Sequence, residues 1–134
     1  MPPYEELDHT ADWSFRVSAS SREELFLEAV AALYDLGSVK TNPEPGEEKT
    51  IELQADDLEG LFVLWLNEIL YLAEHDRLAM RDMRIEVLAR TRLRVSGRTA
   101  EILSAGKDIK AATYSGLHIT ETKGVWQATV VLDV

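Results

Sequence analysis

The chain contains no cysteine, few aromatic residues and no long run of apolar residues. Without cysteine it forms neither disulfides nor thiolate metal sites, which excludes a disulfide-linked partner and a catalytic cysteine. The longest apolar run, residues 61–66, is far shorter than the ~18 residues that a membrane span needs. The first residues also lack the basic and apolar regions of a signal peptide. We therefore expect a cytoplasmic protein that has no membrane partner.

The size and composition of the chain predict one folded domain over residues 1–134. Of its 134 residues, 46% are hydrophobic and 28% are charged, which is typical of a globular protein and excludes a disordered chain. Residues 40–48 contain two prolines and a glycine, so we expect an exposed loop inside the domain there.

Acidic residues outnumber basic ones, and the two kinds are unevenly distributed along the chain. The formal net charge is −10; residues 1–76 hold 18 acidic and 4 basic residues, whereas residues 77–134 hold 6 acidic and 10 basic residues. Because phosphate contacts dominate nonspecific nucleic-acid binding, so acidic a chain does not bind nucleic acid through its whole surface. Solubility explains the excess of acidic residues most simply. The alternative is a surface with one negative and one positive region, which orients a partner.

Apolar residues recur at two different spacings, which together predict an α+β fold. Helical spacing predicts one helix that starts at Ser21 and a second helix, apolar nearly all round, over residues 58–73. Alternation of apolar and polar residues predicts strands at residues 12–19, 50–55, 83–90, 92–96, 109–113, 117–120 and 125–134. We expect a mainly antiparallel sheet with the two long helices packed on one face, and the second helix as the most buried element.

Four local patterns predict where helices and strands begin and end. Ser21 and Glu24 have the spacing of a capping box, and Asp57 suits the N-terminus of the second helix. Gly37 suits a left-handed residue that ends the first helix. Residues 96–98, with a glycine at their centre, predict a break between two strands.

Residues 7–12 bring together two carboxylates, an imidazole and a hydroxyl just before the first expected strand. They read Leu-Asp-His-Thr-Ala-Asp. Oxygen-rich clusters of this kind suit hard cations such as Ca²⁺ or Mg²⁺. A turn in which Asp8 and Thr10 bond nearby backbone amides explains the same spacing, and spacing alone favours the turn.

Five segments, in this order along the chain, resemble the archease family. They are residues 7–12, 21–26, 57–71, 108–114 and the terminal Leu132-Asp133-Val134. The resemblance covers essentially the whole chain and implies an archease-like α+β domain that is not itself an enzyme. It implies a small activator of the GTP-dependent RNA-splicing ligase of the RtcB type, which promotes ligase guanylylation and multiple turnover in tRNA splicing. The ligase is then the partner, and tRNA or other RNA is met only indirectly.

The resemblance also implies a site and a cofactor. The family's divalent metal ion, Ca²⁺ or Mg²⁺/Mn²⁺, falls on Asp12 and Asp133, with a contribution from the backbone oxygen of Leu132. The functionally important lysine of the family falls on Lys110, and His9 in the opening motif is a further candidate for partner contact. Family members usually carry histidines shortly before the lysine segment and just after its tyrosine, and this chain has none at either place.

Strand periodicity is compatible with that site. Asp12 and Asp133 fall on the polar sides of the first and last expected strands, so the two carboxylates reach one rim of the sheet if these strands are neighbours. A bound cation would then remove their mutual repulsion. Alternation from Ile109 onward places Lys110 on the face opposite Ile109, beside Ala112.

The sequence leaves two other functions open, and it contains a set of alternating arginines. The chain could be a chaperone-like interaction module for RNA-modifying enzymes such as tRNA methyltransferases, or a metal-dependent enzyme for a small phosphorylated compound. The sequence contains no evident nucleophile paired with a general base, which argues against an enzyme. Arg90, Arg92 and Arg94 alternate at strand spacing, which favours a solvated outer face over contact with an acidic ligase surface or RNA.

Overall fold

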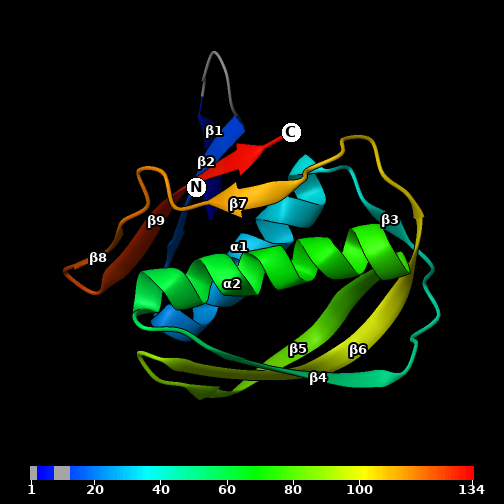
Figure 1. Ribbon diagram of the computed structural model, residues 1–134, viewed down its shortest axis with the longest axis horizontal. Helices are drawn as coiled ribbons and strands as arrows, with labels where there is room; N and C mark the ends of the chain where they lie inside the picture. The colour runs from blue at the N-terminus through cyan, green and yellow to red at the C-terminus, as the bar shows by residue number, and fades with distance from the viewer. Residues whose placement is uncertain (1–2, 8–12) are drawn as a thin grey trace.

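The computed structural model describes residues 3–7 and 13–134, in which two antiparallel sheets enclose two helices (Figure 1). The helices are α1 (Arg22–Leu36) and α2 (Leu58–Tyr71), and α2 continues into a π-helical turn at Leu72–Asp76. The strands are β1 (Tyr4–Leu7), β2 (Trp13–Ala19), β3 (Lys40–Thr41), β4 (Glu48–Gln54), β5 (Leu78–Leu88), β6 (Arg92–Ser104), β7 (Ala111–Thr113), β8 (Ile119–Thr122) and β9 (Val125–Asp133).

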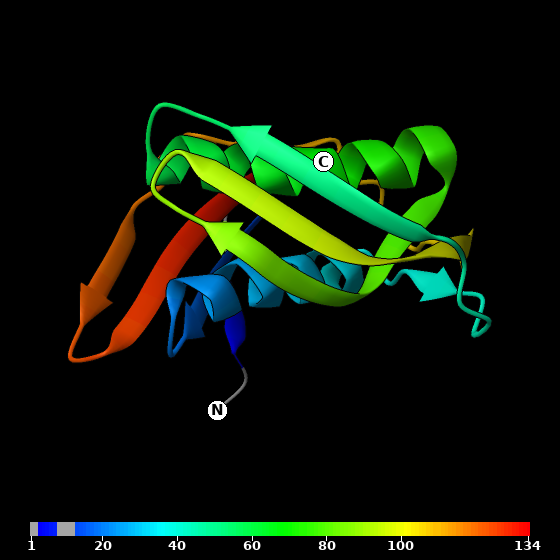
Figure 2. The ribbon, with the colours of Figure 1, turned by 90° about the horizontal axis from the view of Figure 1, so that it is seen from below.

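The first sheet has the strand order β1-β2-β9-β7, with β8 also paired to β9. The second sheet has the order β3-β6-β4, with β5 paired to β6. Both helices lie between these sheets, as the views from the front and from below show (Figures 1 and 2). The expectation of one sheet is therefore wrong, although the strands are antiparallel and each sheet carries the helices on one face.

The division into two sheets follows from the composition of the helices. In α2 the buried residues point in several directions around the axis: Gly60, Leu61, Phe62, Val63, Trp65, Leu66, Ile69 and Leu70. A single sheet would leave part of this apolar surface in water, whereas two sheets cover it from both sides. The expectation that α2 is deeply buried is confirmed.

Trp65 joins the two helices at the centre of the core. Its side chain is completely buried, and its Nε1 donates a hydrogen bond of 2.9 Å to the backbone oxygen of Phe26 in α1. Phe26 and Phe62 pack edge to face, with their ring centroids 5.0 Å apart. The indole group is thus a core residue whose polar atom is satisfied inside the protein.

Both expected helix N-caps are present, and α1 ends at Gly37 as expected, but the left-handed conformation expected of this glycine is wrong. Ser21 Oγ accepts the amide of Glu24 at 3.1 Å, and Asp57 Oδ1 accepts the amide of Gly60 at 2.7 Å. Gly37 has φ −79°, which is not left-handed; the left-handed residue is its neighbour Ser38, with φ 51°.

The backbone of Gly37 instead joins two segments by hydrogen bonds. A Cβ atom placed there would lie 3.2 Å from the backbone oxygen of Leu33 in α1, and 3.6 Å from that of Lys107. The backbone oxygen of Gly37 accepts the amides of Gly106 and Lys107, at 2.9 and 3.2 Å. These bonds hold the loop after β6 against the end of α1, and that loop leads to the candidate site.

The expected break at residues 96–98 is also wrong, because β6 runs through it. A Cβ atom at Gly97 would lie only 2.8 Å from the backbone oxygen of Arg81. The register of β5 against β6 shifts between Arg81 and Arg84, beside this glycine. Gly97 therefore permits a close strand contact at a β-bulge inside the sheet.

Three shorter differences complete the comparison. Strand β1 has no counterpart in the sequence expectations, and β3 occupies the beginning of the expected loop at residues 40–48. Strand β7 starts only at Ala111.

No helix in the described part of the chain has the length and hydropathy of a membrane-spanning helix.

Candidate functional site

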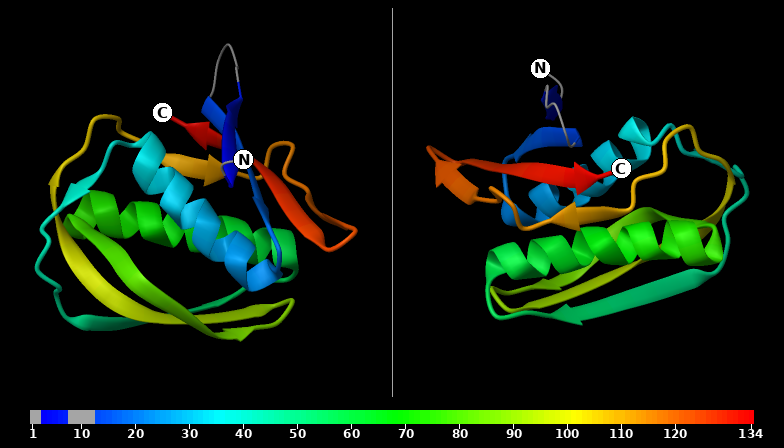
Figure 3. Two further views of the ribbon diagram at one scale, coloured as in Figure 1. Left: turned by 180° about the vertical axis from the view of Figure 1, so that it is seen from behind. Right: turned by 45° about the horizontal axis from the view of Figure 1, so that its top comes forward.

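The C-terminal end of β9 lies between two segments that are distant in the sequence. Trp13 of β2 pairs with Leu132 on one side, and Ala111 of β7 pairs with Asp133 on the other. The backbone amide of Lys110 donates a hydrogen bond of 2.8 Å to the backbone oxygen of Asp133. Figure 3 shows β9 running between β2 and β7 at this end of the sheet. The start of β2, the segment before β7 and the end of β9 therefore meet at one place.

The structure locates three of the five expected site residues. The side chains of Asp133 and Lys110 are exposed, so both can meet a ligand or a partner. The side chain of Leu132 is completely buried, which leaves its backbone as the only part that can act. Asp12 and His9 lie outside the described residues, and their roles stay predictions.

The sequence-based placement of Lys110 is wrong in its detail. Simple alternation would place Lys110 beside Ala112 and opposite Ile109, but Ile109 and Ala112 are both buried, at 8% and 4% exposure. Regular alternation begins only where β7 begins, at Ala111. The irregular backbone before β7 turns Ile109 inward and leaves Lys110 exposed.

Asn67 fixes β7 from the helix side, and the sequence patterns did not single it out. Its Nδ2 donates to the backbone oxygen of Ala112 at 3.1 Å, and its Oδ1 accepts the amide of Ala112 at 2.8 Å. Among the described residues β7 pairs only with β9. The Asn67 amide thus takes the place of a neighbouring strand on the other edge of β7. A polar residue within an otherwise apolar helix is the signal that could have revealed it.

Lys107 is a second residue at this end that sequence analysis missed. Its Nζ lies over the ring of Trp13, 5.1 Å from the ring centroid, which is within the range of a cation–π contact. Trp13 is half-buried at the start of β2. Lys107 therefore links the loop before β7 to the strand that begins immediately after Asp12 in the sequence.

The donor types at this end suit a hard divalent cation. Asp133 offers an exposed carboxylate, and backbone carbonyl oxygens accompany it, so the set consists of oxygen atoms alone. The described residues contain no group of three or more acidic or histidine side chains placed to hold a metal ion. Asp12 lies outside the described residues, so its part in a ligand set stays a prediction.

Only two of the three arginines that alternate in the sequence lie in a strand. Arg92 and Arg94 lie in β6, but Arg90 lies in the turn between β5 and β6 and does not share their strand. Arg94 contacts Glu52 at 3.1 Å and Glu86 at 3.2 Å. A hydrogen bond from Ser96, helped by Arg94, holds the pKa of the Glu86 carboxyl below its ordinary value. Arg94 is thus part of a polar network on an exposed sheet face.

Taken together, these features define a small α+β protein whose candidate site is an exposed strand end. The archease protein family model matches residues 4–134. The chain is 38% identical to protein archease of Methanosarcina barkeri and 33% identical to protein archease of Methanopyrus kandleri. Each alignment covers 98% of this chain, and 95% and 99% of the respective relatives. The chain belongs to the archease family.

Two solved structures agree with this assignment. A crystal structure of an archease from Thermotoga maritima is 28% identical, with a TM-score of 0.72 over 97% of this chain and 96% of that chain. A solution structure of a Methanobacterium thermoautotrophicum protein, 24% identical, has the same fold, with a TM-score of 0.73 over the full length of both chains.

Proposed function

We propose that this chain is a non-catalytic activator of the GTP-dependent RNA-splicing ligase of the RtcB type. It would promote guanylylation of the ligase and its repeated turnover in the cytoplasm, and it would meet RNA only through the ligase. A divalent cation, Ca²⁺ or Mg²⁺/Mn²⁺, would be held by Asp12 and Asp133 with the backbone oxygen of Leu132. Lys110, and His9 in the opening motif, would contact the partner.

One observation carries this proposal beyond family membership. The pairing of Trp13 with Leu132 and the bond from the Lys110 amide to the backbone oxygen of Asp133 bring the start of β2, Lys110 and Asp133 to one strand end. The two carboxylates would then stand beside Lys110, whose side chain forms no ion pair within the described residues. When bound, the cation would supply positive charge that can attract a phosphate or a carboxylate of the partner.

The chain's own residues perform simpler tasks in this proposal. Asp133 would present its carboxylate from the last residue of β9, at a position set by pairing with β7. Lys110, exposed beside it, would offer an ammonium group to an anion of the ligase. Asn67 and the backbone of Gly37 would keep the segment that carries Lys110 in place.

The first prediction is that Asp12 and Asp133 are needed for cation binding and for ligase stimulation. Calorimetry with Ca²⁺, Mg²⁺ and Mn²⁺ should detect binding by the parent protein and none by Asp12→Ala or Asp133→Ala. The rate of ligase guanylylation should rise with the parent and fall back toward the unstimulated rate with either variant. Both variants should stay folded, because the proposed carboxylates hold a cation and do not support the core, and the side chain of Asp133 is exposed.

Glu101→Ala is the matched control, since Glu101 is an exposed acidic residue of the second sheet. It should bind the cation and stimulate the ligase as the parent does. Equal cation binding by parent and both aspartate variants would contradict the metal site. A parent protein that leaves ligase guanylylation unchanged but protects a tRNA methyltransferase from aggregation would favour the chaperone-like alternative.

The second prediction concerns the arginines of β6. Arg92→Glu combined with Arg94→Glu should leave ligase stimulation unchanged at low and at physiological salt. The melting temperature should fall by a few degrees, because Arg94 loses its two exposed ion pairs with Glu52 and Glu86. A loss of stimulation that is larger at low salt would instead show that this face meets an acidic partner surface.

A further inference from the structure

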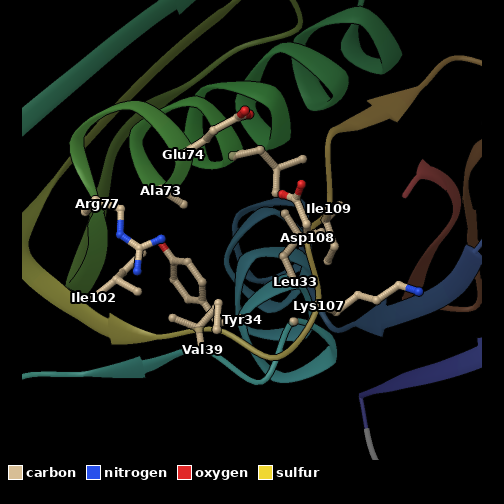
Figure 4. A pocket seen from close by; sticks show the side chains of 13 residues that line it. Leu33, Tyr34, Val39, Ala73, Glu74, Arg77, Ile102, Lys107, Asp108 and Ile109 are labelled. Atoms are coloured by element: carbon tan, nitrogen blue, oxygen red, sulfur yellow. The ribbon is translucent and has the colours of Figure 1, made fainter.

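A pocket of about 340 Å³ lies between the end of α1, the π-helical turn after α2 and the loop before β7 (Figure 4). Apolar side chains form most of its wall, among them Leu33, Val39, Leu70, Ile102 and Ile109. The volume is at the lower end of the range for ligand pockets and is enough for one large apolar side chain. The family-derived site does not use this pocket.

Charged side chains of both signs line the pocket. Arg77, Glu74 and Asp108 line it and are exposed, and none of them forms an ion pair within the described residues. Figure 4 shows Arg77 and Tyr34 on one side of the pocket and Asp108 on the opposite side. Lys107 points away from the pocket in the same view. The rim thus offers a positive group on one side and a negative group on the other.

Tyr34 adds a polar atom on the side of Arg77. Its hydroxyl oxygen accepts the backbone amide of Met80 at 2.8 Å. Burial raises the pKa of Tyr34 to about 12, so the hydroxyl keeps its proton at physiological pH. That proton is available to an acceptor beside Arg77, because the oxygen uses a lone pair for Met80.

The backbone at Arg77 is in an unfavourable conformation. Arg77 has φ 57° and follows a π-helical turn, and glycine is the residue that ordinarily occupies such a left-handed position after a helix. π-Helical turns and left-handed non-glycine residues concentrate at functional sites. An arginine at this position costs stability, and its guanidinium is the feature that glycine would not supply.

The pocket shares one loop with the candidate site at the end of β9. One wall is formed by Ala105, Lys107, Asp108 and Ile109, which belong to the loop that carries Lys110. The amide of Lys110 bonds the backbone of Asp133. A partner segment seated in the pocket would therefore touch the loop that presents Lys110.

We propose that this pocket receives an apolar side chain of the protein partner, flanked by an acidic residue that pairs with Arg77 and a basic residue that pairs with Asp108 or Glu74. This inference rests on the proposed function, in which the partner is the RNA-splicing ligase. A polypeptide of mixed charge matches a rim of both signs. A nucleic acid strand would be repelled by the two carboxylates.

The test measures ligase affinity with two pocket variants and one control. Arg77→Gly removes the guanidinium and relieves the backbone, while Ala73→Leu fills part of the pocket and keeps every charge. Lys123→Gly is the matched control, because Lys123 is also a left-handed cationic residue, with φ 53°, but lies in the turn between β8 and β9. Titration of the immobilised ligase should show roughly tenfold weaker binding by both pocket variants and parent-like binding by Lys123→Gly.

Thermal unfolding separates docking from stability in the same variants. Arg77→Gly should melt at or above the parent temperature although it binds the ligase more weakly, and a structural role for Arg77 would not produce that combination. If both pocket variants bind as the parent does while the parent stimulates guanylylation, the docking pocket is wrong and the proposed function stands. A parent protein that does not bind the ligase overturns both.

Discussion

Lys110→Ala is expected to lose most of its stimulation of the RNA-splicing ligase while the protein stays folded and binds its cation. The side chain of Lys110 is exposed, and it makes no ion pair or hydrogen bond within the described residues. The bond to Asp133 uses the backbone amide, which alanine retains. The ammonium group is therefore free for a partner, and its removal costs the fold little.

The stability of this variant supplies the internal check. A surface change of about 0.5 kcal/mol moves the melting temperature by a few degrees at most. Lys40→Ala is the matched control, because Lys40 is an exposed lysine of β3. It should keep both the melting temperature and the stimulation of guanylylation.

Two results would contradict the role of Lys110. A melting temperature far below that of the parent would show that Lys110 supports the structure through its charge. A stable variant that stimulates the ligase fully would show that the lysine role known for the family does not apply to this chain. Calorimetry on the same sample would show whether the cation site is intact.

Sequence patterns predicted the elements of this fold better than their assembly. The caps at Ser21 and Asp57, the burial of α2 and the long strand β9 depend on neighbours in the chain, and these were correct. The division into two sheets depends on which strands pair across long stretches of sequence, such as β2 with β9. No local pattern records that pairing.

The two glycines that were misread show the same limit. Gly37 and Gly97 were assigned to a left-handed helix end and a strand break, which are the local uses of glycine. Each in fact lies where another segment comes close: Lys107 beside Gly37, and Arg81 beside Gly97. Sequence identifies a glycine, but the structure is needed to show whether it turns the chain or lies against another segment.

The candidate site was predicted unevenly for a related reason. Asp133 and Lys110 were identified because the family resemblance assigns roles to them. It assigns none to Asn67 or Lys107, which act through contacts with distant segments. Asn67 is separated from Ala112 by 45 positions in the sequence. Its importance becomes visible only when α2 and β7 are side by side.

Asn67→Ala is expected to reduce both the stability of the protein and its stimulation of the ligase. Alanine leaves the amide and the carbonyl of Ala112 without their partner on the free edge of β7. Loss of such a partner from a part-buried backbone group costs about 1–3 kcal/mol. The short strand β7, only three residues long, then holds the segment of Lys110 less firmly. Gln54→Ala, at an exposed amide residue of β4, should change neither property.

Asn67→Asp distinguishes the hydrogen bonds from the packing of the side chain, because aspartate has nearly the shape of asparagine. An ionised aspartate can accept from the amide of Ala112 but cannot donate to its carbonyl, so the folded state favours the protonated form and raises the pKa of this aspartate. The folded state then binds more protons than the unfolded state just above the ordinary aspartate pKa of about 4. The free energy of unfolding of the variant should consequently approach that of the parent as the pH falls toward 4, and the deficit should be full at neutral pH. If Asn67→Asp is as stable as the parent at neutral pH, packing of the side chain, and not the paired hydrogen bonds of Asn67, holds β7 against α2.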